Sequence, residues 1–343
     1  MNSRVTLQDV AREAGVSSAT VDRVLNARDG VRHRTREIVM SAAQRLGYIE
    51  TPGAIPDAGE AVGALHLVFL LPAGTNAFMH VLRNQIETQS AERADLRVEV
   101  EMIEGFNPQT VAARLAELRG QVSGVGLVAQ DHPLVREAIR MAAAVGTHIV
   151  TLASDIQSVP RIAYVGIDNR QAGRLAGHLL GRFLGQRPDA KVALFAGSMS
   201  YRGHEEREMG FRHILSEEFP DLRIVERREV MDDRQKAFAE TEALLDLHPD
   251  LAAIYNVGAG TYGIAQALKT RGLDGRLLLV GHEATEDNKQ LLLDGTLDAV
   301  IDQNPRVEAR EALNLLSAAA RGNPYSFVPL RLQVIFRENL PNE

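Results

Sequence analysis

The chain has 343 residues, no cysteine and a net charge of −7 at neutral pH, and 45% of its residues are hydrophobic. This length is enough for two or three domains with their own cores, and the missing cysteines exclude disulfides, thiolate metal sites and cysteine nucleophiles. Neither a long apolar run nor a charged and then apolar leader is present, so we expect a cytoplasmic protein with no membrane partner.

The first predicted unit is a pair of short helices around a glycine. In TLQDVAREAGVSSATVDRVLN, residues 6–26, apolar side chains recur at helical spacing on both sides of Gly15, and a third helical run follows at 38–46. Thr6 and Ser17 are placed to cap the first two helices. Such a small three-helix unit is typical of a helix-turn-helix that presents its second helix to the DNA major groove; the alternative is a plain helical hairpin.

Charge supports DNA contact near the N-terminus only. Residues 1–50 hold eight arginines and six acidic residues, a net charge of +2, which leaves −9 on the rest of the chain. Any contact with phosphates must therefore be local, and the alternative is that these arginines form an ordinary solvated surface.

A linker and then an alternating pattern follow. Residues 51–63, TPGAIPDAGEAVG, have two prolines, three glycines and no basic residue. From residue 64 onward strand-like apolar runs alternate with predicted helices at 77–93, 108–119, 133–145, 170–184, 203–217, 234–246, 261–271 and 285–294. This alternation predicts an α/β fold with two doubly wound parallel-sheet lobes, and a ligand crevice at the carboxyl ends of the strands.

Together these patterns resemble the lactose-repressor (LacI/GalR) family of bacterial transcription regulators. The motifs VTLQDVAREAGVSSATVDRVLN, TREIV and RLGYI carry the likeness in the first 49 residues, and YVGIDNRQAGRLAGHLL, EREMGF and DAVIDQNP carry a likeness to periplasmic sugar-binding proteins in the rest. The resemblance implies a headpiece at 1–50, a linker at 51–63 and an effector domain at 64–343. One lobe would comprise about 64–166 and 304–325, the other about 167–303 and 326–343.

The resemblance also implies a function: a homodimeric regulator, expected to be a repressor, that binds a pseudopalindromic operator in double-stranded DNA and responds to a sugar or polyol. It implies no enzymatic activity and no cofactor. The expected DNA-contact residues are Thr6, Ser17, Ser18, Ala19, Asp22, Arg23, Arg32 and Thr35.

Two features depart from the family pattern. Arg23 is the expected base reader, since a guanidinium fits O6 and N7 of guanine. Asp22, however, stands where the family commonly has serine, and it would accept from cytosine, repel phosphate or form a local surface charge. The linker lacks the arginine and the leucine wedge of hinge-helix relatives, so we expect little bending of the operator.

The resemblance places the effector residues at strand ends of both lobes: Asn76, Phe78, Asp131, Asp155, Arg207, Asn256, Glu283 and Gln303. Carboxylates, amides and an arginine around an aromatic face suit a sugar or polyol, because each hydroxyl both donates and accepts. Arg207 is the expected charged anchor in the crevice. The alternative for Arg207 is a surface ion pair with a neighbouring glutamate, Glu205, Glu206 or Glu208.

Two other functions stay open at this point. The turn GAGTYG, residues 258–263, follows a strand and opens a helix, with Glu283 twenty residues further on, which matches the dinucleotide fingerprint of an NAD-dependent oxidoreductase. Against this function, the motif lies late in the second series and no catalytic constellation accompanies it. A transport-type sugar-binding protein fits the second half of the chain but not the helix-turn-helix.

Overall fold

The computed structural model describes residues 6–25, 35, 38, 39, 42, 43, 63–185 and 187–341. It divides into two units, Met1–Val62 and Gly63–Glu343. Arg32 and nearly all of the predicted linker lie outside the described residues. No helix in the described part of the chain is long and apolar enough to span a bilayer.

The first unit contains two short helices, α1 (Leu7–Ala14) and α2 (Ser18–Leu25). Gly15 makes the turn between them with φ of +64°, and the Ser17 hydroxyl accepts a hydrogen bond from the Thr20 amide at 3.2 Å. Apolar side chains of both helices form a small core with a third helical run: Val10, Ala11, Ala14, Val21, Val24, Val39, Ala42 and Ala43. The predicted helix-turn-helix is therefore confirmed.

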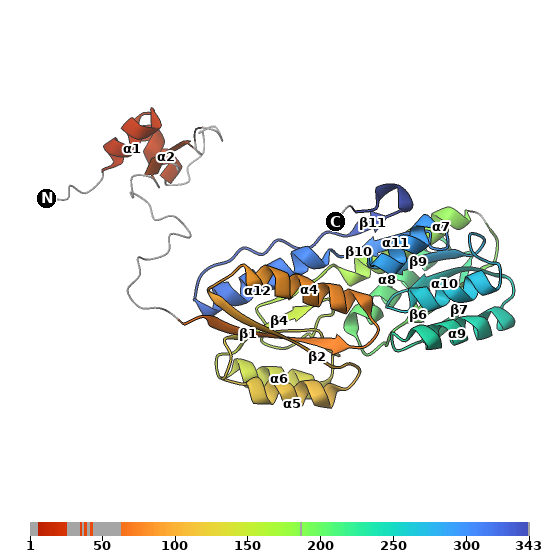
Figure 1. Ribbon diagram of the computed structural model, residues 1–343. Helices are drawn as coiled ribbons and strands as arrows, with labels where there is room; N and C mark the ends of the chain where they lie inside the picture. The colour runs from red at the N-terminus through yellow and green to blue at the C-terminus, as the bar shows by residue number, and fades with distance from the viewer. Residues whose placement is uncertain are drawn as a thin grey trace. The chain divides into compact units, whose positions relative to one another are not determined.

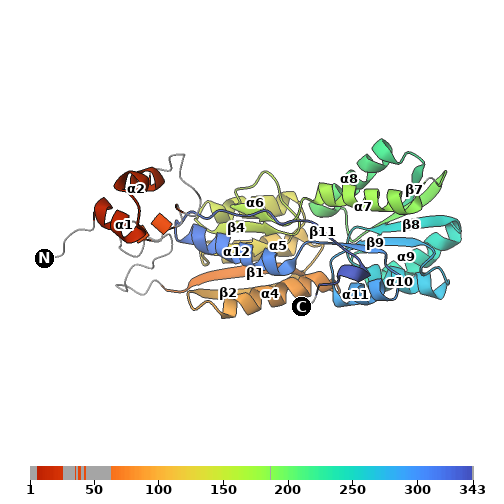
Figure 2. The same cartoon turned by 90° about the horizontal axis from the view of Figure 1, so that it is seen from above.

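The second unit has two lobes, each a sheet with helices on both faces (Figure 1, Figure 2). The sheet of lobe 1 is parallel with the order β2-β1-β3-β4-β5. Its strands are β1 (Leu65–Ala73), β2 (Leu96–Glu104), β3 (Gly124–Leu127), β4 (His148–Leu152) and β5 (Ala163–Val165). One face packs against α4 (Ala77–Ala91) and α12 (Pro305–Ala320), the other against α5 (Pro108–Leu118) and α6 (Pro133–Ala143).

Lobe 2 has the strand order β11-β10-β9-β8-β6-β7. Its strands are β6 (Ala190–Ala196), β7 (Leu222–Glu229), β8 (Leu251–Asn256), β9 (Leu278–His282), β10 (Ala299–Asp302) and β11 (Gln333–Ile335), of which β11 runs antiparallel to β10. One face of this sheet packs against α7 (Asn169–Leu184) and α8 (Arg202–Glu218). The other face packs against α9 (Arg234–Leu247), α10 (Thr261–Thr270) and α11 (Glu286–Leu293). A short 3₁₀ turn, Arg337–Asn339, follows β11.

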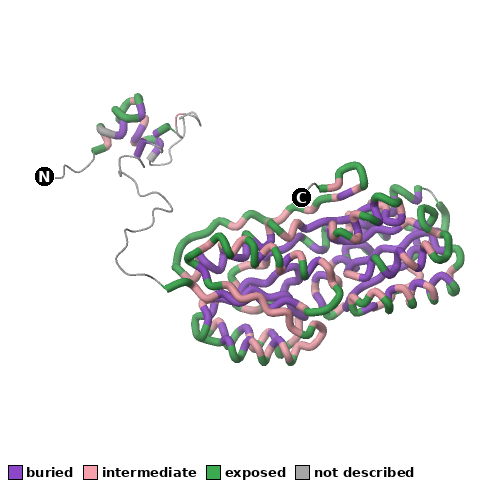
Figure 3. Tube along the Cα trace, viewed as in Figure 1, coloured by how far each residue is buried: buried purple, intermediate pink, exposed green. Residues whose placement is uncertain are grey.

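The chain passes between the lobes three times: after β5, after β10 and after α12. In Figure 3 the central strands of both lobes are buried, the edge strands β2 and β7 are mostly half-buried, and the outer helices show buried and exposed residues in turn. Each parallel sheet gathers the carboxyl ends of its strands at one edge, which is where α/β folds bind ligands. The predicted fold class of two doubly wound lobes is confirmed.

Candidate functional site: a pocket between the lobes

A pocket of about 510 Å³, partly open to solvent, lies between the two lobes. The pocket is bounded by segments that follow strands of both sheets and by the first turns of α4 and α8. It is lined by Pro72, Asn76, Phe78, Met79, Val128, Ala153, Ser154, Tyr201, Gly203, His204, Arg207, Asp232, Gly258, Ala259, Glu283 and Gln303.

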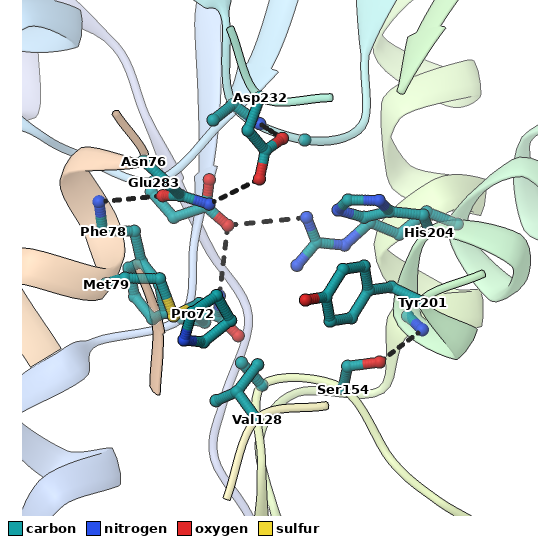
Figure 4. A pocket seen from close by; sticks show the side chains of 16 residues that line it. Pro72, Asn76, Phe78, Met79, Val128, Ser154, Tyr201, His204, Asp232 and Glu283 are labelled. Carbon is teal, nitrogen blue, oxygen red and sulfur yellow. Dashed lines mark hydrogen bonds and ion pairs between the residues drawn. The ribbon is translucent and has the colours of Figure 1, made fainter. Parts of the chain in front are cut away.

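Asn76 and Phe78 form the lobe 1 side of the pocket, opposite His204 and Tyr201 of lobe 2 (Figure 4). Asn76 follows β1 and caps α4, with Oδ1 accepting from the Phe78 amide at 3.1 Å. Its Nδ2 donates across the pocket to Oδ2 of Asp232 at 3.0 Å. The cap fixes the Asn76 side chain, so the amide is held in place before any ligand arrives.

Arg207 forms the cationic part of the lobe 2 side. Its side chain is 4% exposed; Nε donates to Oδ1 of Asn169 at 2.8 Å and Nη1 to the Val257 carbonyl at 2.7 Å. Nη1 also lies 3.4 Å from Oε1 of Glu283. Within the described residues Nη2 makes no hydrogen bond, so this nitrogen is available to a ligand. The alternative of a surface ion pair with a neighbouring glutamate is therefore excluded.

Glu283 and Gln303 follow β9 and β10 and supply acceptors. Oε1 of Glu283 accepts from Nε2 of Gln303 at 3.1 Å, and burial raises the pKa of Glu283 to about 7. Oε1 of Gln303 is buried and has no donor among the described residues. A buried acceptor without a donor is costly, so a ligand hydroxyl that donates there would satisfy it.

We expect Glu283→Gln to remove a pH-dependent part of the stability. Between the ordinary glutamate pKa of 4.5 and the folded-state value of about 7, the folded protein keeps a proton that the unfolded chain has lost. The free energy of unfolding of the native protein therefore falls as pH rises through this window. Relative to the variant, the native protein should lose about 3 kcal/mol between pH 4.5 and pH 8.

Urea denaturation without ligand at several pH values measures this difference. Glu205→Gln, which changes an exposed carboxyl of α8, is the matched control and should leave the pH dependence of the native protein intact. Parallel stability curves for the native protein and Glu283→Gln would contradict the expectation.

Other lining residues were not expected from the sequence. Asp232 follows β7, Ser154 follows β4, and Tyr201 and His204 lie at the start of α8. Nδ1 of His204 lies 2.9 Å from the Ser198 carbonyl oxygen and 3.3 Å from the Ser198 amide nitrogen, so Ser198 holds the imidazole in place. Asp232 could have been predicted from its place after a strand, as the other site residues were. His204 could have been predicted because it lies three residues before Arg207 and therefore on the same face of the predicted helix.

Backbone strain marks the same place. Three non-glycine residues that line the pocket have left-handed backbone: Ala153 with φ of +53°, Asp232 with +55° and Glu283 with +61°. Such conformations persist only where the surroundings hold them, and they cluster at ligand sites. The strain therefore supports a binding role for this pocket.

Asp131, Asp155 and Asn256 do not line the pocket, because each is engaged locally. Asp131 accepts from Nε of Arg136 at 2.5 Å, and Asp155 accepts from Nη2 of Arg161 at 2.6 Å. Nδ2 of Asn256 donates to the carbonyls of Gly258 and Ala259 and to Oγ1 of Thr261. The two aspartates are thus neutralised inside lobe 1, and Asn256 shapes the turn before α10.

The GAGTYG motif, residues 258–263, follows β8, and its last three residues form the first turn of α10, as the fingerprint requires. Packing explains its last glycine, because a Cβ at Gly263 would lie 2.1 Å from the carbonyl oxygen of Arg234. In addition, the Ala259 amide donates to Oδ1 of Asp232 at 3.0 Å, so a carboxylate already occupies the place of a pyrophosphate. This arrangement disfavours a dinucleotide.

A candidate DNA-binding surface lies on the first unit. On α2, Ser18, Ala19 and Arg23 are exposed while Val21 and Val24 are buried in the core, so the exposed three share a face away from that core. The remaining described members of the predicted set are exposed or half-buried: Thr6, Ser17, Asp22 and Thr35. Their contacts with DNA stay a prediction.

Two parallel-sheet lobes that meet over a polar pocket define a small-molecule-binding domain of the periplasmic binding protein type. A family model described as a periplasmic binding protein domain matches residues 67–324, and the model of bacterial regulatory proteins, lacI family, matches residues 6–50. The chain belongs to the lacI family of bacterial regulatory proteins, with a periplasmic binding protein domain following its helix-turn-helix.

Relatives of two kinds match the chain. The lactose operon repressor of Escherichia coli (strain K12) is 29% identical over 294 residues, 83% of this chain and 77% of the repressor. The ribose import binding protein of Bacillus subtilis (strain 168) is 26% identical over 233 residues, 68% of this chain and 74% of that protein. A solute-binding protein of Burkholderia graminis C4D1M, solved with D-arabinose, has a TM-score of 0.77 and 20% identity over 83% of this chain and 99% of its own.

These matches confirm the predicted family. The lacI-type helix-turn-helix and the match to the repressor along most of both chains show a DNA-binding, sugar-responsive transcription regulator. The matches to solute-binding proteins show the fold that the second unit shares with them.

Proposed function

We propose that the protein is a homodimeric repressor whose interlobe pocket binds one monosaccharide or polyol. The observation that carries this proposal is the pocket, where strand ends of both lobes bring together Asn76, Phe78, Arg207, Glu283 and Gln303. Amide, guanidinium and carboxylate groups beside an aromatic ring suit a ligand that is covered with hydroxyls. The relatives named for ribose and for lactose support the same class of effector.

Regulation follows from the place of the pocket between the lobes. Bonds already cross from one lobe to the other: Oγ1 of Thr75 donates to the Asp232 carbonyl at 2.7 Å, and the Gly203 amide donates to Oγ of Ser154 at 3.1 Å. An effector that prefers one arrangement of the lobes shifts the population toward it. In a homodimer this shift changes the spacing of the two headpieces. Because a pseudopalindromic operator has two half-sites at a fixed spacing, the change alters the affinity for the operator.

The proposal also covers where the protein works and whether it catalyses a reaction. A regulator of bacterial operators works in the cytoplasm, where the chromosome lies. We propose no enzymatic activity and no cofactor, in line with relatives named as repressors and binding proteins and with the carboxylate of Asp232 at the GAGTYG turn.

The experiment starts by selecting operator DNA from a random duplex library with the full-length protein. Fluorescence anisotropy then measures operator affinity with D-ribose, D-arabinose, D-galactose, lactose and sorbitol. We expect at least one of these to change the affinity by tenfold or more, and size-exclusion chromatography with light scattering to show a dimer. Sugar binding without any DNA binding would favour the transport-type alternative, and an NADH fluorescence change the oxidoreductase.

A further inference from the structure

Asp232 holds a position that the sugar-binding role alone does not explain. It follows β7, and both Asp232 and the preceding Met231 have left-handed backbone, with φ of +55° and +54°. Its side chain joins two segments: Oδ1 accepts from the Ala259 amide in the turn before α10, and Oδ2 accepts from Nδ2 of Asn76 in lobe 1. Two consecutive residues with strained backbone therefore position the Asp232 carboxylate, and its two hydrogen bonds hold it there.

That place is where a bound anion would sit. Helix α10 begins at Thr261 after Gly260, and no side chain of its own N-cap bonds its first amides. Free amides and the helix dipole favour negative charge at such an end. The Asp232 carboxylate accepts from the Ala259 amide, two residues before the first residue of α10, at 3.0 Å, so the protein places its own anion beside this end of the helix.

The neighbouring cation is also neutralised. A second pocket adjoins the first at the start of α10, and its lining includes Arg234, Tyr262 and Asp287. The Arg234 guanidinium lies 5.0 Å from the Tyr262 ring centroid and forms an ion pair with Asp287. Across both pockets three carboxylates face two guanidinium groups, and no lysine is among the lining residues of the described chain. Glu283 is about half-protonated near pH 7, and the carboxyl groups still balance the two guanidinium groups, so an anionic ligand group would meet no excess of positive charge here.

We propose that Asp232 is a specificity-determining residue: it fills the anion position at the start of α10 and restricts the effector to sugars or polyols without a phosphate or carboxylate at that end. This inference rests on the proposed function. It also fits the buried Oε1 of Gln303, which has no donor among the described residues and calls for a ligand group that donates, as a hydroxyl does.

Inorganic phosphate tests the proposal without knowledge of the sugar. Calorimetry at constant ionic strength compares the full-length native protein with Asp232→Gly, which accepts the left-handed backbone and vacates the position, and with Asp232→Asn, which removes only the charge. Asp274→Asn makes the same charge change at an exposed residue beyond the other end of α10 and is the matched control. Circular dichroism verifies that each variant is folded.

We expect phosphate to bind Asp232→Gly at least tenfold more tightly than the native protein or Asp274→Asn, with Asp232→Asn in between. Equal phosphate affinity in the native protein and Asp232→Gly overturns the proposal. A sugar that the native protein binds should bind at least tenfold more weakly as its phosphate ester, and the reverse order also overturns it. The absence of any sugar effect on operator binding counts against the proposed function instead, because the phosphate titration does not depend on it.

Discussion

Replacing Arg207 by alanine is expected to weaken effector binding tenfold to a hundredfold. The guanidinium is buried and its Nη2 is directed to no other hydrogen bond within the described chain, so a ligand hydroxyl would lose a charged donor. Such a bond contributes about 1.5–3 kcal/mol, which corresponds to this range of affinities. Above about pH 7, where Glu283 loses its proton, the same change leaves this buried carboxylate without its cation, and there we expect the free energy of unfolding to fall by about 3–5 kcal/mol.

Calorimetry with the sugar that proves active measures the first effect, and urea denaturation the second. Arg207→Lys separates them, because a lysine keeps the charge beside Glu283 but lacks the planar fork that holds Asn169 and Val257. Arg212→Ala, which removes a half-exposed partner of Glu208 from the same helix, should change neither quantity much. An unchanged dissociation constant in Arg207→Ala would remove this arginine from the effector site.

Arg23→Ala should reduce affinity for the selected operator at least thirtyfold. Arg23 lies exposed on α2 between the buried Val21 and Val24, so its side chain projects from the face opposite the core. A bidentate contact with a guanine contributes about 1–3 kcal/mol, and a dimer would lose two such contacts. Anisotropy at fixed salt, with the effector response as a check on the second unit, measures the loss.

Binding to DNA of unrelated sequence shows whether Arg23 contacts bases or only phosphates. If Arg23 contacts only phosphates, its loss weakens specific and non-specific binding alike and lowers the salt dependence by about one ion per subunit, or about two for a dimer. A drop confined to the selected operator supports base readout. Equal operator affinity for Arg23→Ala and the native protein would place this arginine outside the interface.

The sequence predicted most of the fold because strand and helix patterns alternate cleanly. The eight predicted helices of the second unit agree with the observed ones to within two residues at each end. Helix α12 was not predicted, since it buries Glu308, Glu311 and Ser317 beside its leucines and alanines and so shows no clean apolar stripe. Strand β11 was missed because three residues are too few for a periodic signal.

The site was predicted only in part, because a strand end fixes where a residue lies but not which partner its side chain meets. Asn76, Phe78, Arg207, Glu283 and Gln303 line the pocket. The carboxylates of lobe 1 instead meet arginines five and six residues further along the chain, as described above. Asp232 acts through contacts with segments more than 25 residues away in sequence, and such pairs leave no local pattern.

The late return of the chain to lobe 1 has a consequence for synthesis. The apolar face of β1, β3 and β4 is covered partly by α12, whose last residues are made after about nine-tenths of the chain. Until then all five strands of lobe 1 are present but Phe69 and Val150 lack part of their cover, and exposed apolar surface of this kind binds chaperones or aggregates. Gln303, the last residue in the sequence that lines the pocket, precedes both α12 and β11, so every lining residue of the effector pocket is synthesised before the two lobes are complete.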